Sequence, residues 1–270
     1  MKPLLVPALL GSLLTTAPAP EVTIAVSPAG FTAPATLPAG QVTFTVRSMD
    51  PRGAWIGLVR LRRGVTLERY LADLVRAMGD DPVEGGKDVA RDVEMFGGVA
   101  VAEVPAAATM RVPPGEYHLV DFRDVGLPDL ADRVHPVRVV PGGSTEAPRP
   151  TARITLRDGE FEAPARLCGP VLVVNRSSQN NEAMLMPVRT GTSLGDVDAF
   201  FAEVDAGRYP AQSPFTGGPT GVVPLSPGHS AILDAGLPAG DYALVTWVRD
   251  LDTGKMFAAR GMRTLLKVEG

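Results

Sequence analysis

Residues 22–37 read VTIAVSPAGFTAPATL, and residues 152–167, which begin 130 positions later, read ARITLRDGEFEAPARL. Three residue types recur at the same spacing, so that Phe31, Pro34 and Leu37 correspond to Phe161, Pro164 and Leu167. The first stretch opens with apolar residues that alternate with polar ones, the two-residue period of a half-buried β-strand. Such a repeat predicts that the chain is a duplication of one β-rich module.

Four further matches follow in the same order along the chain. GQVTFTVRS (40–48) corresponds to GPVLVVNRS (169–177), GVTL (64–67) to GTSL (191–194), FGG (96–98) to FTGG (215–218), and PGEYHLV (114–120) to AGDYALV (239–245). We therefore expect one domain over residues 21–140 and a second over 151–270. Residues 141–150, PGGSTEAPRP, are rich in Pro and Gly and predict a linker of limited stiffness between the two.

One helix is expected within each copy. Apolar residues recur at the 3–4 spacing of an amphipathic helix in both: Leu67, Leu71, Leu74 and Met78 in the first copy, and Val197, Phe200, Phe201 and Val204 in the second. Thr66 and Ser193 precede these runs, where a hydroxyl accepts hydrogen bonds from the free N–H groups of a helix start.

Short strands, Gly- and Pro-containing turns and one inserted helix per copy predict an all-β fold of two Greek-key β-sandwiches in tandem. The Phe-x-x-Pro-x-x-Leu spacing, the Gly-led strand after it and LPAGDYALV (237–245) resemble exported bacterial cupredoxin-like domains. The resemblance covers most of residues 151–270 and, more weakly, residues 21–140. It implies a cupredoxin-like fold for both copies.

The resemblance also implies where copper ligands would stand, namely two His, one Cys and often a Met. In the second copy the first His place falls within residues 177–182, which contain Asn180 and Asn181, and the Cys place falls on Thr246. The second His would lie near Phe257, and only Met262 fits. In the first copy, residues 50–53 and Asp121 occupy the corresponding places. These residues do not supply a soft anionic sulfur, so no blue-copper site and no cofactor are expected.

Methionines offer an alternative, because thioethers suit Cu(I). Met184 and Met186 share one face of a strand, and Met256 and Met262 are expected to come near them. We align Met184 with the bulky Trp55 of the first copy, which favours core packing over metal binding. Copper handling through these four methionines remains an alternative.

A third alternative is a serine hydrolase. Gly191-Thr-Ser193-Leu-Gly195 matches the Gly-x-Ser-x-Gly pattern of the hydrolase nucleophile elbow. That reading needs His229 together with Asp205 or Asp234, on a parallel α/β sheet that is not expected here. The first copy keeps the capping Thr66 but lacks the final Gly, so we expect a helix cap and no catalytic residues.

The remaining polar candidates are interpreted as structural. The three histidines have no metal-ligand spacing; His118 and Asp121 are predicted on opposite sheet faces, and His135 and His229 at exposed loop or strand-end positions. The acidic residues Asp80, Asp81, Glu84 and Asp88 lack calcium-loop spacing and predict a solvated loop. Cys168 has no partner for an intramolecular disulfide and is expected to be half-buried at the start of a strand.

The net charge and the N-terminal residues limit the partners and the location that we expect for this protein. The net charge is −4 with no basic stripe, which excludes nucleic acid as an expected partner. Residues 1–20 predict a signal peptide: Lys2, an apolar run over residues 4–14 that is too short to span a membrane, and small residues at 15–19. We expect a secreted or cell-envelope protein with no membrane span after signal removal. Its expected role is non-enzymatic, structural or binding, with an unidentified protein or small ligand at loop ends or between the domains.

Overall fold

The computed structural model describes residues 17–142 and 145–269. Most of the predicted signal peptide therefore lies outside the described residues. Within the described part of the chain, no helix is long and apolar enough to cross a membrane.

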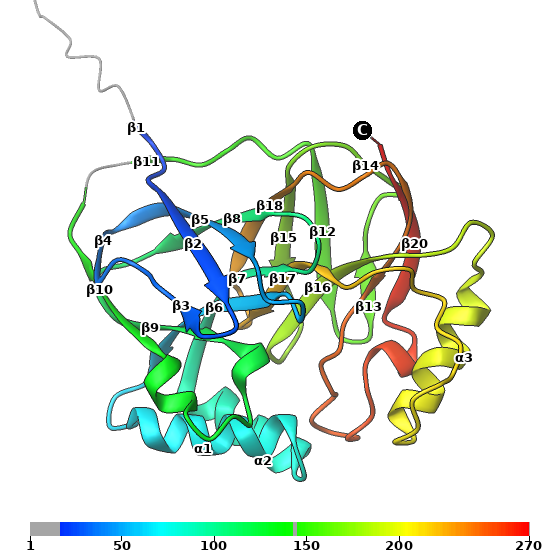
Figure 1. The fold of residues 1–270 in the computed structure, drawn as a ribbon, viewed down its shortest axis with the longest axis horizontal. Helices are drawn as coiled ribbons and strands as arrows, with labels where there is room; N and C mark the ends of the chain where they lie inside the picture. Colours follow the sequence, from blue (N-terminus) through cyan, green and yellow to red (C-terminus); the bar gives the residue numbers. More distant parts are fainter. Residues whose placement is uncertain (1–16, 143–144, 270) are drawn as a thin grey trace, which may run out of the picture.

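The first copy is a sandwich of two sheets (Figure 1). Four strands belong to an eight-stranded sheet: β2 (Glu21–Ser27), β3 (Gly30–Phe31), β5 (Gly40–Ser48) and β8 (Ala106–Val112). Five belong to a ten-stranded sheet: β4 (Thr36–Pro38), β6 (Ala54–Leu61), β7 (Val93–Val101), β9 (Gly115–Asp121) and β10 (His135–Val140).

The second copy repeats this arrangement in the same two sheets. Its strands in the eight-stranded sheet are β12 (Ala152–Arg157), β13 (Glu160–Glu162), β15 (Val171–Asn175) and β18 (Ser230–Ala235). Those in the ten-stranded sheet are β14 (Arg166–Leu167), β16 (Asn181–Pro187), β17 (Thr220–Leu225), β19 (Gly240–Val245) and β20 (Arg263–Val268). Two short strands, β1 (Ala17–Pro18) and β11 (Thr145–Glu146), pair separately. The prediction of an all-β fold built from two β-sandwich copies is confirmed.

The two copies join edge to edge, which the sequence did not indicate. The ten-stranded sheet runs β14-β20-β19-β16-β17 and continues with the equivalent strands in reverse order, β7-β6-β9-β10-β4. The junction consists of the antiparallel pairs β17–β7 and β18–β8. This is the geometry of a two-fold symmetric dimer built within one chain. Hydrogen-bonded strands, in addition to residues 141–150, therefore connect the two copies.

Strand register corrects two details of the sequence alignment. Val120 of β9 pairs with Gly57, and the equivalent Val245 of β19 pairs with Met184. Met184 thus corresponds to Gly57, and Trp55, two residues earlier, corresponds to Glu182. The FGG and FTGG segments do not correspond either, because Phe96 lies within β7 whereas Phe215 precedes β17.

The helices cover the outer face of the ten-stranded sheet, as the lower part of Figure 1 shows. Helices α1 (Leu67–Met78) and α3 (Leu194–Asp205) confirm the two predicted helices, and Thr66 and Ser193 cap them as expected. Met78, expected on the buried face of α1, is instead 52% exposed.

Helix α2 (Pro82–Asp92) occupies the acidic segment for which a loop was predicted. Gly85 lets α2 approach α1 closely, because a Cβ at this position would lie 2.4 Å from the Ala77 nitrogen. Arg76 of α1 pairs with Asp81 at 2.7 Å and with Asp88 at 2.9 Å. These contacts with α1 stabilise α2 although Gly85 and Gly86 lower its intrinsic helix propensity.

The apolar core has two parts, and each extends across both copies. An inner cluster fills the space between the two sheets and includes Phe44, Leu119, Ile154 and Leu244. An outer cluster lies between the ten-stranded sheet and the helices and includes Tyr70, Met184, Phe201 and Val245. The protein therefore has three layers: eight-stranded sheet, ten-stranded sheet and helices.

Candidate functional site

The place that the cupredoxin resemblance assigns to copper in the second copy is filled by a neutral hydrogen-bonded cluster. The Asn181 Nδ2 donates to the Met262 sulfur at 3.4 Å, and the Thr246 Oγ1 donates to the Asn181 Oδ1 at 3.0 Å. All three residues have no exposed surface. The structure therefore brings together three of the residues that the sequence placed here. Their polar atoms hydrogen-bond to one another. None of the three side chains is a thiolate, the soft anionic ligand of a blue-copper site.

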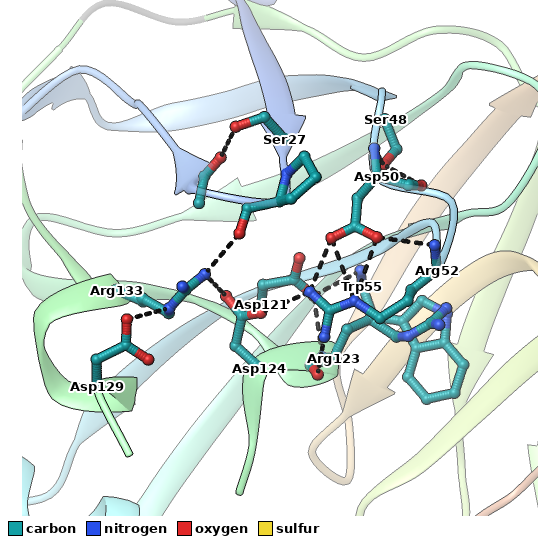
Figure 2. A network of polar contacts seen from close by, with 12 residues as sticks. Ser27, Ser48, Asp50, Arg52, Trp55, Asp121, Arg123, Asp124, Asp129 and Arg133 are labelled. Carbon is teal, nitrogen blue, oxygen red and sulfur yellow. Dashed lines mark hydrogen bonds and ion pairs between the residues drawn. The ribbon is translucent and has the colours of Figure 1, made fainter. Parts of the chain in front are cut away.

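The corresponding place in the first copy holds a network of ion pairs, drawn in Figure 2. Arg52 pairs with Asp50 at 2.7 Å and with Asp124 at 3.2 Å, and Arg133 approaches Asp124 at 3.5 Å. Asp121, at the Cys place, accepts hydrogen bonds from the backbone N–H groups of Trp55 and Arg123 at 2.9 and 3.0 Å. The loop of residues 50–53 and the end of β9 thus meet, as the alignment predicted.

The carboxyl groups of this network differ in acidity. The hydrogen bonds from Arg52 lower the pKa of Asp50 below its usual value. Burial raises the pKa of Asp121, because the hydrogen bonds from the Trp55 and Arg123 backbone N–H groups offset only part of the loss of water. The network links loop segments of the first copy. Among the described residues, no group of three or more His, Cys, Asp or Glu side chains has metal-binding geometry.

The four candidate methionines do not form one group. Met184, Met186 and Met256 belong to the outer cluster beneath the helices, and Met262 belongs to the inner cluster between the sheets. Met262 is therefore separated from the other three by the ten-stranded sheet, contrary to the expectation that all four come together.

The hydrolase candidates are also apart. The Ser193 hydroxyl exchanges hydrogen bonds with Asp196 in a capping box at the start of α3. His229 binds the Glu94 carboxylate at 2.9 Å, and Asp205 binds Arg249 at 2.8 Å. Asp234 is an exposed residue of β18. No nucleophile–base pair forms among them, and the structure agrees with the predicted role of Ser193 as a cap.

Three smaller expectations are corrected by the packing. His229 is only 22% exposed in its side chain and contacts the Phe96 ring edge to face with ring centroids 4.6 Å apart, so it is not a free loop residue. His135 likewise contacts the Phe31 ring, at 4.6 Å. Cys168 is exposed in the turn after β14, where half-burial was expected.

A cavity that no sequence pattern indicated lies where the two copies meet. It has a volume of about 340 Å³ and is lined mostly by apolar side chains from both copies. Its walls include α1 and α2 on one side and the segment after β19 on the other. We call it the junction cavity.

Residues at equivalent positions of the two copies line the junction cavity. Trp55 and Glu182 are one such pair, and Phe122 and Trp247 are another. The cavity therefore lies across the approximate two-fold axis, but its two sides differ chemically. The indole Nε1 atoms of Trp55 and Trp247 are both buried without a hydrogen-bond partner among the described residues. Buried donors without a partner are uncommon in folded proteins.

Glu182 is the buried acid of the junction cavity. Its Oε1 accepts the Trp247 backbone N–H at 2.8 Å, and its side chain makes no other hydrogen bond to the described residues. Complete burial raises the pKa of Glu182 to about 7. The signal available in the sequence was a single acid, Glu182, directly before the apolar stretch AMLM (183–186). The presence of only two tryptophans was a second signal.

A second pocket, of about 640 Å³, shares Trp55 and Trp247 with the junction cavity. It is also lined by Arg52, Glu103 and Arg123 and by Tyr209, which is 77% exposed. We call it the Arg123 pocket. The two tryptophans thus form a shared wall between an apolar space and a polar one.

No protein-family model matches the sequence, and a search of curated proteins finds no relative. Among solved structures, reduced auracyanin from Roseiflexus castenholzii is 19% identical over 44% of this chain and 95% of its own, with a TM-score of 0.26. A multicopper oxidase is 11% identical over 92% of this chain and 88% of its own, with a TM-score of 0.25. The copper nitrite reductase of Nitrosomonas europaea is 10% identical over 93% and 94%, also with a TM-score of 0.25. These low scores leave the fold to be defined by the strand order and pairing described above.

Proposed function

We propose that this chain is an exported, non-enzymatic binding protein that holds a small, mostly apolar ligand in the junction cavity. The observation that carries the proposal is the apolar cavity between the two copies, which is lined by side chains of both copies and by both tryptophans. Apolar cavities with a few polar groups are the usual form of small-molecule sites.

The places assigned to copper support a role without blue-copper chemistry. Asn181, Thr246 and Met262 bind one another, and the ion pairs of Asp50, Arg52 and Asp124 occupy the other copy. Export is proposed from the sequence of residues 1–20. The proposed location is the cell envelope or the exterior.

Tryptophan fluorescence is expected to report ligand binding directly. Both tryptophans of the chain line the junction cavity, so energy transfer to an uncharged fluorescent probe such as N-phenyl-1-naphthylamine will be saturable, with one probe per chain. Ala77→Phe places a ring in the cavity and will weaken probe binding about tenfold or more. The measurement is a titration followed by tryptophan quenching and probe emission.

The matched control is Ala202→Phe, which adds the same ring at an exposed position of α3 outside the cavity. It should bind the probe as the parent protein does. Equal weakening in both variants, or no saturable binding in the parent protein, would contradict the proposal.

A Cu(I) titration with a competing chelator is expected to show no tight binding. The reason is that Met262 lies on the opposite face of the ten-stranded sheet from Met184, Met186 and Met256, and that its sulfur already accepts a hydrogen bond. Tight binding that is lost in both Met184→Leu and Met262→Leu would overturn this expectation and establish copper handling.

A further inference from the structure

We propose that the Arg123 pocket binds a carboxylate, so that the ligand is an apolar or aromatic carboxylic acid. This inference rests on the proposed function, because the two spaces share Trp55 and Trp247. The carboxylate would bind Arg123, and the apolar part would pass the tryptophans into the junction cavity.

Arg123 is held in place but unpaired. Its guanidinium lies over the Trp55 ring, 5.2 Å from the centroid. Among the described residues, no carboxylate lies within 4.0 Å of its guanidinium nitrogens, and these nitrogens make no hydrogen bond. The guanidinium N–H donors therefore stay free for bidentate binding of a carboxylate.

The other charged groups of the pocket favour Arg123 as the anion site. Arg52 is engaged by Asp50 and Asp124, at 2.7 and 3.2 Å. Glu103 also lines the pocket, but it is exposed, and water screens its charge. Burial lowers the pKa of Arg123 from its usual value, although the nearby Asp121 acts to raise it, so this cation is partly removed from water. A bound carboxylate would pair directly with its guanidinium.

The junction cavity suits the apolar part of such a ligand. Its own basic group, Arg249, is already paired with Asp205 at 2.8 Å, and Glu182 is fully buried. A second carboxylate at that end would meet an acidic side chain and no free cation. The arrangement therefore favours a monocarboxylate, bound with its charged end in the Arg123 pocket.

The test compares 1-naphthylacetate with its uncharged amide, 1-naphthylacetamide, by quenching of the two tryptophans. The parent protein should bind the carboxylate about tenfold or more tightly than the amide, as expected for hydrogen bonds to charged groups. Arg123→Gln should remove this preference while leaving amide binding within about twofold. The control, Arg63→Gln, changes an exposed arginine that lines neither space and should leave both affinities unchanged.

The outcomes separate the two proposals. If N-phenyl-1-naphthylamine and the amide bind but the carboxylate has no advantage, or if Arg123→Gln retains that advantage, the carboxylate site is wrong and the junction cavity stands. If no probe binds to the parent protein, the proposed function itself fails. Arg123→Lys adds a check, because a retained charge without the planar fork should restore only part of the preference.

Discussion

Replacing Gly98 by alanine is expected to lower the free energy of unfolding by about 3–5 kcal/mol, from backbone strain and overpacking together. Gly98 lies in β7 beside the junction with φ +148°, which side-chain-bearing residues rarely adopt. A Cβ there would come 2.0 Å from the Ile56 carbonyl oxygen, so the neighbouring strand would have to move. Urea unfolding monitored by circular dichroism measures the change.

The control is Gly236→Ala. Gly236 is exposed after β18, and a Cβ added there would meet no atom within 4 Å. Its stability should change by less than about 0.5 kcal/mol, as for ordinary surface substitutions. Similar losses in the two variants would show that the close packing of β6 against β7 is not as described.

The Gly98→Ala variant also tests whether the two copies unfold together. Trp55 lies in the first copy and Trp247 in the second, so Trp247→Phe and Trp55→Phe proteins each report one copy. Because both sheets continue across β17–β7 and β18–β8, Gly98→Ala should shift the two midpoints equally. A shift seen only by Trp55 would mean that the copies are energetically separate.

The second large effect is expected from pH acting on Glu182. Its pKa is about 7 in the folded protein, against an ordinary value of 4.5. Between these values the folded protein binds the proton more strongly than the unfolded chain does, so stability decreases as pH rises from about 4.5 through about 7. A difference of about 2.5 pKa units corresponds to about 3 kcal/mol lost above pH 7.

Glu182→Gln should remove this loss. The amide oxygen can still accept the Trp247 N–H, and it carries no charge at any pH. The variant should resemble the parent protein near pH 4 and exceed its stability by up to about 3 kcal/mol at pH 8–9. The measurement is urea unfolding at a series of pH values. Glu160→Gln, at an exposed position, is the control. A stability difference between Glu182→Gln and the parent protein that does not change with pH would contradict the assignment.

Much of the fold could be predicted because duplication repeats its signals. The alternating residues of β2, the caps at Thr66 and Ser193 and the strand around Tyr242 each follow from local pattern. Helix α2 did not, since its stability depends on contacts with α1. The shared sheets were missed for a similar reason: a strand edge that pairs with another copy has the same residue pattern as one that faces water.

The candidate site was predictable only in part. Asn181, Thr246 and Met262 were placed together by alignment with a family pattern, and they do meet. Glu182, Trp55 and Arg123 were not identified, because their importance comes from a cavity formed by both copies. The error that aligned Met184 with Trp55 also hid the equivalence of Trp55 and Glu182.

That equivalence has a consequence for how a guest molecule would be held. Two identical subunits would present the same side chain from both walls, and a guest could enter in either of two reversed orientations. Here one wall offers an indole where the other offers an acid, because each half of a fused chain mutates independently. A guest with distinct ends would therefore have a single preferred direction.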